Sequence, residues 1–149
     1  MMSLDEKHES KGEPHNMKTI AVILGLAFTA LAADTWEKMK DCTARADKIV
    51  ADQLRDSGHV DGYDSSNHYS PKYNHCYVRF TIYSISSRQK DGTPKGFAHT
   101  TLIDAYEGDD LATIHEPMND KESRAWCTIG GSSDSCPAAW AFIDDHMHN

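Results

Sequence analysis

The chain has 149 residues, of which 39% are hydrophobic, and it carries a net charge of -8 with an isoelectric point near 5.5. This length suits one domain with a modest core. Binding to nucleic acid depends on clustered Lys and Arg, so the acidic balance and the lack of a basic cluster argue against a nucleic-acid partner. The same charge argues against docking on an anionic membrane surface, which leaves proteins, small molecules and cations as partners.

The N-terminal stretch predicts targeting rather than fold. Residues 1–16 are charged and have no apolar periodicity, which indicates a disordered extension or a start codon assigned too early. Residues 17–32 begin with Met17 and Lys18, continue with an apolar run of about a dozen residues and end in small residues, as secretory signal peptides do. The run is shorter than the roughly 20 apolar residues of a spanning helix.

The predicted cleavage point follows Ala32. A lipoprotein signal would need Cys nearby, but Asp34 follows Ala33, so we expect no stable membrane anchor after cleavage. The mature protein, residues 33–149, is then a single α+β domain in the periplasm or outside the cell.

The mature chain begins with a predicted amphipathic helix. Apolar residues recur at three- and four-residue spacing from Trp36 to Leu54, and Asp34 or Thr35 can cap the start. The helix is expected to end near Gly58, and the polar stretch that follows, up to Asn67, is typical of a loop.

The clearest strand follows this loop. From Cys76 to Tyr83, apolar and polar residues alternate with a period of two, as they do in a half-buried strand. A further short strand is predicted within residues 124–129, and Pro137 is placed to open a last helix.

Residues 97–106 and 111–115 predict a hairpin. The expected register places Leu102 opposite His115, which sends His99 and His115 to opposite faces of the sheet. Together the elements predict an α+β fold: an N-terminal amphipathic helix packed on a small antiparallel sheet of three or four strands, with a short C-terminal helix and two disulfides.

Four cysteines in a short exported chain favour two disulfides, for which three pairings are possible. The most economical geometry joins Cys42 to Cys76, which pins the first helix to the clearest strand. It also joins Cys127 to Cys136, which pins the last helix to the strand before it. No two cysteines have the spacing of a CxxC redox centre or a zinc ribbon.

Polar and aromatic residues gather before and within the clearest strand, and they are the candidate binding surface. Such residues combine rigid area with adaptable hydrogen bonds, although the rings are more simply explained as a cover for the outer sheet face. The candidates are Tyr69, Tyr73, Asn74 and Tyr77.

The sequence predicts no catalytic residue and no cofactor. It contains no GxSxG, HExxH or phosphate-loop motif. One alternative function is a hydrolase that uses His68 or His75 with a carboxylate brought close by folding. A second is metal binding, because imidazole is a common transition-metal ligand, although the spacing of the histidines is poor. The histidines of the mature chain are His59, His68, His75, His99, His115, His146 and His148.

Three short segments carry a resemblance. These are CTARA at residues 42–46, HYSPKYNHCY at residues 68–77 and DAYEG at residues 104–108. They resemble a loose group of small, uncharacterised bacterial exported proteins and lipoproteins, in which a Cys-bearing helix precedes an HYN...N.CY segment. The resemblance implies export and the pairing of Cys42 with Cys76, but it implies no catalytic residue. We therefore expect an exported accessory domain that binds an unknown protein or small molecule without catalysis.

Overall fold

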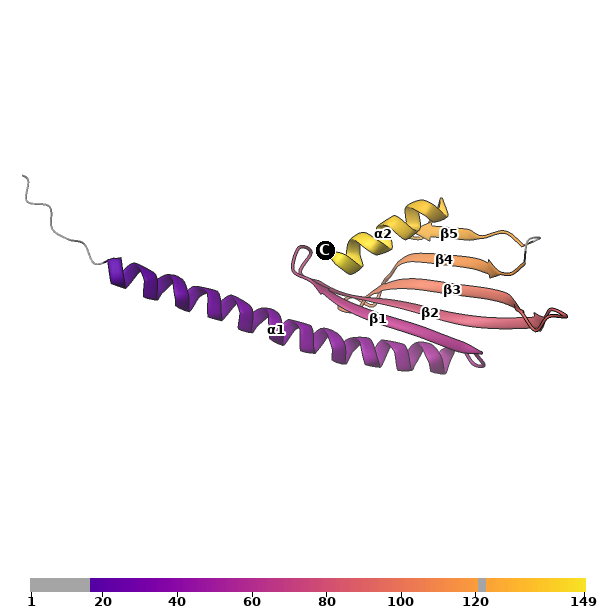
Figure 1. Cartoon of the computed structure of the whole chain (residues 1–149), viewed down its shortest axis with the longest axis horizontal. Coiled ribbons are helices and arrows are strands. Elements are labelled where there is room, and N and C mark those ends of the chain that lie inside the picture. Colours follow the sequence, from indigo (N-terminus) through magenta and orange to yellow (C-terminus); the bar gives the residue numbers. More distant parts are fainter. Residues whose placement is uncertain (1–16, 121–122) are drawn as a thin grey trace, which may run out of the picture. The chain divides into compact units, whose positions relative to one another are not determined.

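The structure is a computed structural model that describes residues 17–120 and 123–149, with side chains from residue 34 onward (Figure 1). The predictions for residues 1–16 lie outside the described residues. The chain divides into two compact units, Met1–Asp34 and Thr35–Asn149. The second unit contains all the strands and both disulfides.

In the described residues two helices flank six strands. In chain order they are α1 (Met17–Asp56), β1 (Gly62–Ser70), β2 (His75–Arg88), β3 (Pro94–Asp104), β4 (Asp110–Met118), β5 (Trp126–Ile129), β6 (Ser132–Asp134) and α2 (Cys136–His148). The strands form one antiparallel sheet in the order β1-β2-β3-β4-β5-β6.

The predicted fold class is wrong in the extent of both the first helix and the sheet. Helix α1 is continuous from Met17, so neither Asp34 nor Thr35 begins a helix. No proline interrupts the chain between Met17 and Asp56, and a helix can continue where no residue blocks its hydrogen bonds. It ends where Gly58 adopts a positive φ of 69°.

The sheet has six strands rather than three or four, because polar segments also pair. The stretch expected to be a loop, which ends at Asn67, contains most of β1, whose sequence is GYDSSNHYS. As an edge strand β1 has a single neighbour, and most of its side chains are at least partly exposed, so its sequence lacks an apolar alternation. Strand β6 consists of three exposed residues and carries no pattern at all.

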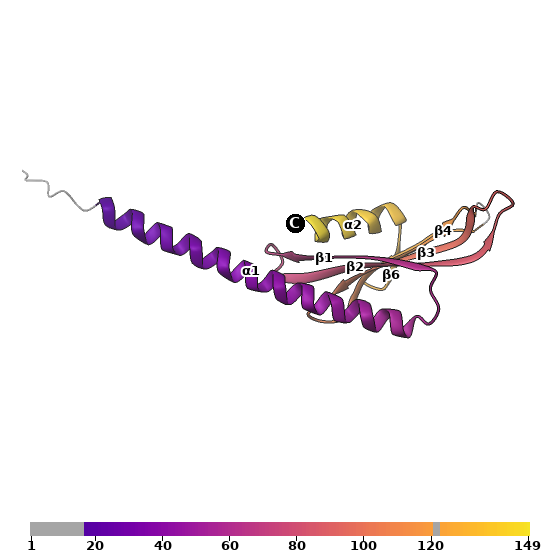
Figure 2. The ribbon, with the colours of Figure 1, turned by 60° about the horizontal axis from the view of Figure 1, so that its bottom comes forward.

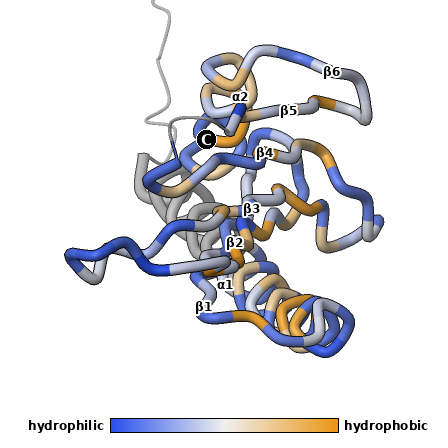
Figure 3. The backbone as a smooth tube through the Cα atoms, turned by 90° about the vertical axis from the view of Figure 1, so that its right-hand side faces the viewer, coloured by the Kyte–Doolittle hydropathy of each residue, from blue (hydrophilic) through white to orange (hydrophobic). Residues whose placement is uncertain are grey.

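Two hydrophobic clusters lie on opposite faces of the sheet, one containing residues of α1 and the other containing residues of α2. Figure 2 shows α2 and the C-terminal part of α1 on opposite sides of the strands. Figure 3 shows hydrophobic stretches in β2, β3 and the neighbouring part of α1. The α1-side cluster consists of Cys42, Ala46, Tyr69, Cys76, Val78, Phe80, Ile103 and Ala105. The α2-side cluster consists of Tyr77, Leu102, Ala112, Ile114, Cys127, Ala139, Ile143 and Met147.

Part of the predicted apolar stripe on α1 is not buried. Cys42 and Ala46 are buried, but Trp36 is 59% exposed and Met39 is 48% exposed. Helix α2 is confirmed: Ser135 caps it by accepting a hydrogen bond from the Ala138 backbone N–H at 3.3 Å, and a proline lies in its first turn.

The predicted register of the β3–β4 hairpin is wrong. Leu102 pairs with Ala112 rather than with His115, and His115 pairs with His99. The turn begins earlier than expected because the carboxylate of Asp104 accepts hydrogen bonds from two backbone N–H groups of the turn, at 2.9 and 3.3 Å. A register shift between Leu102 and Ile103 then changes the pairing near the turn.

Both predicted disulfides are present. The Cys42–Cys76 bond joins α1 to β2, and the Cys127–Cys136 bond joins β5 to the start of α2. The sequence separations are 34 and 9 residues. Each disulfide therefore ties one helix to the face of the sheet that it covers.

Candidate functional site

Four ring side chains on three adjacent strands form what we call the aromatic–histidine strip: Phe97 and His99 on β3, His115 on β4 and Trp126 on β5. The register places His99 directly opposite His115, and His115 directly opposite Trp126. His99 also pairs with Ile82, which packs against the α1-side cluster. The strip therefore lies on the α1 side of the sheet, but none of its members belongs to the buried cluster there.

The rings of the strip contact one another in a continuous series. His115 stacks on Phe97 with ring centroids 4.6 Å apart, and on Trp126 with centroids 5.2 Å apart and an interplanar angle of 12°. The ring of His99 meets that of His115 edge to face at 5.8 Å. Trp126 is 50% exposed, so the series ends on an aromatic ring that is open to solvent.

The two histidines of the strip differ from a solvated imidazole in burial and in hydrogen bonding. The Nδ1 atom of His115 is buried and has no hydrogen-bond partner among the described residues. Burial lowers the pKa of His99, and the neighbouring His115 lowers it further, against a smaller opposing effect of Asp110. The lowered pKa favours the neutral form of His99.

Hydroxyl groups flank the strip on the same face. The next row of the sheet pairs Thr101 with Thr113, Thr113 with Thr128, and Thr128 with Ser133. Thr113 and Thr128 are partly exposed. The α1 side of β3, β4 and β5 thus offers rings, imidazole nitrogens and hydroxyls within two neighbouring rows.

A second arrangement joins His75, the first residue of β2, to Asp104, the last residue of β3. The Nδ1 atom of His75 lies 2.5 Å from Oδ2 of Asp104, and the side chain of Asp104 is 8% exposed. The other carboxylate oxygen, Oδ1, accepts from the backbone N–H groups of Tyr106 and Glu107. In the tautomer of neutral imidazole whose Nδ1 donates to the carboxylate, the lone pair is on Nε2 of this partly exposed ring.

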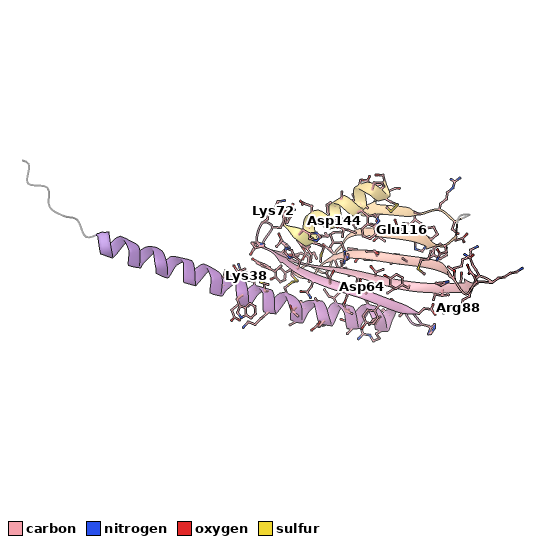
Figure 4. The ribbon with its side chains drawn as sticks, in the orientation of Figure 1. Lys38, Asp64, Lys72, Arg88, Glu116 and Asp144 are labelled. Atoms are coloured by element: carbon pink, nitrogen blue, oxygen red, sulfur yellow. A yellow bond between two sulfur atoms is a disulfide. The ribbon has the colours of Figure 1, made fainter. Side chains whose placement is uncertain are left out.

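Close to this pair, the β1–β2 turn contacts the C-terminal end of α2. The hydroxyl of Tyr73 donates to Asp145 at 2.5 Å, and the ring of Tyr73 stacks on His146 with centroids 4.9 Å apart. Lys72 lies 3.5 Å from the same carboxylate, and Figure 4 shows it beside this end of α2. Burial, with smaller effects of nearby carboxylates, raises the pKa of Tyr77 to about 12.

The structure divides the residues of the predicted binding surface between different places. Tyr69 is buried in the α1-side cluster, whereas Tyr77 is buried in the α2-side cluster on the other face. Tyr73 and Asn74 lie at the β1–β2 turn, where Asn74 has a positive φ of 55° and its Oδ1 accepts from the Tyr69 hydroxyl at 2.8 Å. Of the four, Asn74 alone is exposed.

The other predicted histidines are dispersed. His68 lies on β1, and its Nε2 atom is buried without a hydrogen-bond partner among the described residues. Burial and the nearby His148 lower the pKa of His68. His59 and His148 are exposed, and His146 packs against Phe142 with ring centroids 4.2 Å apart. Within the described residues, no group of three or more His, Cys, Asp or Glu side chains is arranged to hold a metal ion.

Three pockets lie between α1 and its neighbours. One of about 280 Å³ includes Met39, Tyr69 and Pro71 in its lining, one of about 310 Å³ includes Leu54 and Tyr63, and one of about 260 Å³ lies between α1 and the β3–β4 turn. None of these three pockets is lined by His75, Asp104 or a member of the strip.

Sequence reasoning missed the strip, and although it proposed that His75 could meet a carboxylate, it did not identify Asp104 as that carboxylate. The strip was missed because the three-residue error in the hairpin register sends His99 and His115 to opposite faces. The polar turn after Asp104, with Gly108 at a positive φ of 82°, was a signal that the hairpin could close earlier. No sequence signal indicated that Asp104, 29 residues from His75, would be its partner.

Comparison with protein-family models, with curated proteins and with solved structures finds no match to this chain. The resemblance noted from the short segments therefore remains a prediction. Within the part of the chain that the structure describes, no helix combines the length and apolar character needed to cross a membrane. The two disulfides fit an oxidising location such as the periplasm or the extracellular space.

Proposed function

We propose that this protein is an exported, non-catalytic binding domain that holds its ligand on the aromatic–histidine strip. In this proposal a leader is removed after Ala32, and the remaining domain acts in the periplasm or outside the cell. The observation that carries the proposal is the strip itself: three strands place two aromatic rings and two imidazoles side by side, outside the buried cluster on their face.

The chemistry of the strip supports binding rather than structural support. An aromatic ring that is half exposed at the end of a series of rings offers a flat apolar surface, on which a planar group of a ligand can stack. The partly exposed hydroxyls of Thr113 and Thr128 in the neighbouring row can position such a ligand through hydrogen bonds. A small molecule or peptide with a planar group fits these features.

The test uses backbone amide NMR spectra of the domain of residues 33–149. Small aromatic compounds, oligosaccharides and short peptides would be added in turn, and we expect at least one class to shift the resonances of the strip. Trp126→Ala should abolish that shift. The matched control is Trp36→Ala, since Trp36 is also an exposed indole but lies on α1. Shifts that map only to other surfaces, or that survive Trp126→Ala, would contradict the proposal.

A second candidate function is hydrolysis, which the contact between His75 and Asp104 favours. Asp104 is buried and accepts the Nδ1 proton of His75, so Nε2 of a partly exposed imidazole can take a proton from an attacking water molecule. The same carboxylate also anchors the β3–β4 turn through its other oxygen, and this structural role accounts for the position of Asp104 without any reaction.

Hydrolysis is tested with a panel of chromogenic esters, amides and phosphate esters. If the pair is catalytic, His75→Ala and Asp104→Asn should each remove any activity found, whereas the exposed residue change His59→Ala should leave it unchanged. Activity that persists in both variants, or none across the panel, counts against this second candidate.

A further inference from the structure

We infer that His99 and His115 form a binding site for a divalent late transition metal, such as Cu²⁺ or Zn²⁺. The two residues are directly opposite each other on adjacent antiparallel strands and share one face of the sheet. This inference rests on the proposed function, since it assigns a ligand class to the same strip.

The spacing of the two rings suits one shared ion. A transition metal lies about 2.0–2.1 Å from an imidazole nitrogen, so two rings that ligate the same ion have their centroids roughly 5 to 6.4 Å apart. The observed separation between the centroids of His99 and His115 is 5.8 Å, with the rings inclined at 64°. The backbone register therefore places the two rings at a separation that suits a shared ion. Rotation of the two side chains could then direct one nitrogen of each ring to that ion.

The unsatisfied state of His115 is an independent observation that points to a ligand. Its Nδ1 atom is buried and has no hydrogen-bond partner within the described residues. Buried polar atoms usually have a partner, and each exception calls for an explanation such as a bound ion or water. A metal ion bound by this nitrogen would satisfy it, and the ring of His99, with its centroid 5.8 Å from that of His115, is the neighbouring source of a second nitrogen.

The surroundings narrow the class of ion. The site offers two nitrogen ligands and, in the described residues, no third side chain from His, Cys, Asp or Glu completes it. Imidazole suits copper, nickel and zinc, and the affinity of nitrogen sites is highest for Cu²⁺. Water or a group of a second ligand would take the remaining coordination positions, next to the exposed ring of Trp126.

Fluorescence of Trp126 provides a local reading of the site. Trp36→Phe with Trp140→Phe leaves Trp126 as the remaining tryptophan of the domain, because the chain has three. Trp126 stacks directly on His115, so Cu²⁺ bound at the pair should quench its emission saturably. Zn²⁺ should compete with the quenching and, in the unaltered domain, should shift the side-chain ¹⁵N resonances of His99 and His115.

Substitution of either ligand should weaken binding. Even outer-shell partners of a metal site are worth about 10–100-fold in affinity, so His99→Ala and His115→Ala should each weaken Cu²⁺ binding at least tenfold. His59→Ala is the control, since His59 is exposed on the α1–β1 connection. If a ligand variant fails to fold by circular dichroism, the ¹⁵N shifts of the unaltered domain still decide the matter.

The outcomes separate the two proposals. Zn²⁺ shifts confined to other histidines such as His146 and His148, or quenching unchanged in both ligand variants, would overturn the metal site. If organic probes still shift the strip in that case, the proposed binding function stands without the metal. If neither metal nor organic probes affect the strip, both proposals fail.

Discussion

The two faces of the sheet are each covered by one helix and each tied to that helix by one disulfide, yet they are covered to different extents. On the α2 side, the buried cluster takes residues from β2, β3, β4 and β5. On the α1 side, the cluster takes its strand residues from β1, β2 and β3 alone. The aromatic–histidine strip lies beyond that cluster. The difference indicates that the strip owes its exposure to where α1 lies and not to a lack of apolar residues.

Removal of a disulfide should lower the free energy of unfolding by several kcal/mol, and the loss should differ between the two faces. On the chain-entropy model, loops of 34 and 9 residues give about 4 kcal/mol for Cys42–Cys76 and about 2.5 kcal/mol for Cys127–Cys136. We expect paired Cys→Ala variants to lose free energy of unfolding in that order in urea titrations. Equal losses would show that loop length does not set the contribution of each disulfide.

Truncation of one residue on each face should show whether that residue belongs to the core, because loss of a core side chain costs more free energy of unfolding than loss of an exposed one. Ile114 is 1% exposed in the α2-side cluster, so Ile114→Ala should cost about 2–5 kcal/mol of the free energy of unfolding. Trp126 is 50% exposed, and Trp126→Ala should cost less than about 1 kcal/mol. Chemical unfolding of both variants checks this. A loss for Trp126→Ala as large as that for Ile114→Ala would make the strip part of the core.

The contact between His75 and Asp104 should contribute less. Asp104→Ala leaves two turn N–H groups and the imidazole without their acceptor, which should cost about 1–3 kcal/mol. Asp104→Asn keeps an acceptor for the turn and should cost less. Thermal unfolding at pH 7 measures both, and equal losses would show that the charge of Asp104, rather than its contacts with the turn, is what matters.

The smallest expected effect is a pH dependence due to His68. Burial and His148 lower its pKa in the folded state below the usual 6.5, so the unfolded chain takes up the proton first as the pH falls. Above about pH 7.5, His68 is neutral in both states and does not change the free energy of unfolding. As the pH falls through 6.5 towards the folded pKa, the unfolded chain binds the proton more readily, so the free energy of unfolding decreases. His68→Asn should therefore lose less stability than the unaltered domain between pH 7.5 and 5.5. An unchanged pH dependence in urea titrations would contradict this.

Local chemistry predicted some elements of the fold well. The alternation after Cys76, the opening of the last helix at Pro137 and the two disulfide pairs all agree with the structure. The strand and the helix start depend on residues that are near one another in the sequence. The disulfides depend on a choice among only three possible pairings. The start of α1 and the number of strands were wrong because a helix has no internal boundary signal and because polar edge strands lack alternation.

The candidate sites depended on information that the sequence does not hold locally. Whether His99 faces His115 is decided by a turn whose length is set by hydrogen bonds to Asp104. A difference of three residues in register moves every side chain of one strand to the opposite face relative to its partner. The candidate binding surface at Tyr69 and Tyr77 shows the same difficulty, because those rings are buried on opposite sides of the sheet.

The strands follow one another in the sheet in the same order as in the chain, and this order affects when the aromatic–histidine strip can form during synthesis. Each strand pairs with the one synthesised just before it, so pairing closes short loops and can proceed from the N-terminus as the chain emerges. The α1-side cluster needs nothing beyond Ala105, whereas the strip is incomplete until Trp126 joins β4 through β5. We therefore expect a nascent chain halted before residue 126 to have its first core in place and still lack the strip.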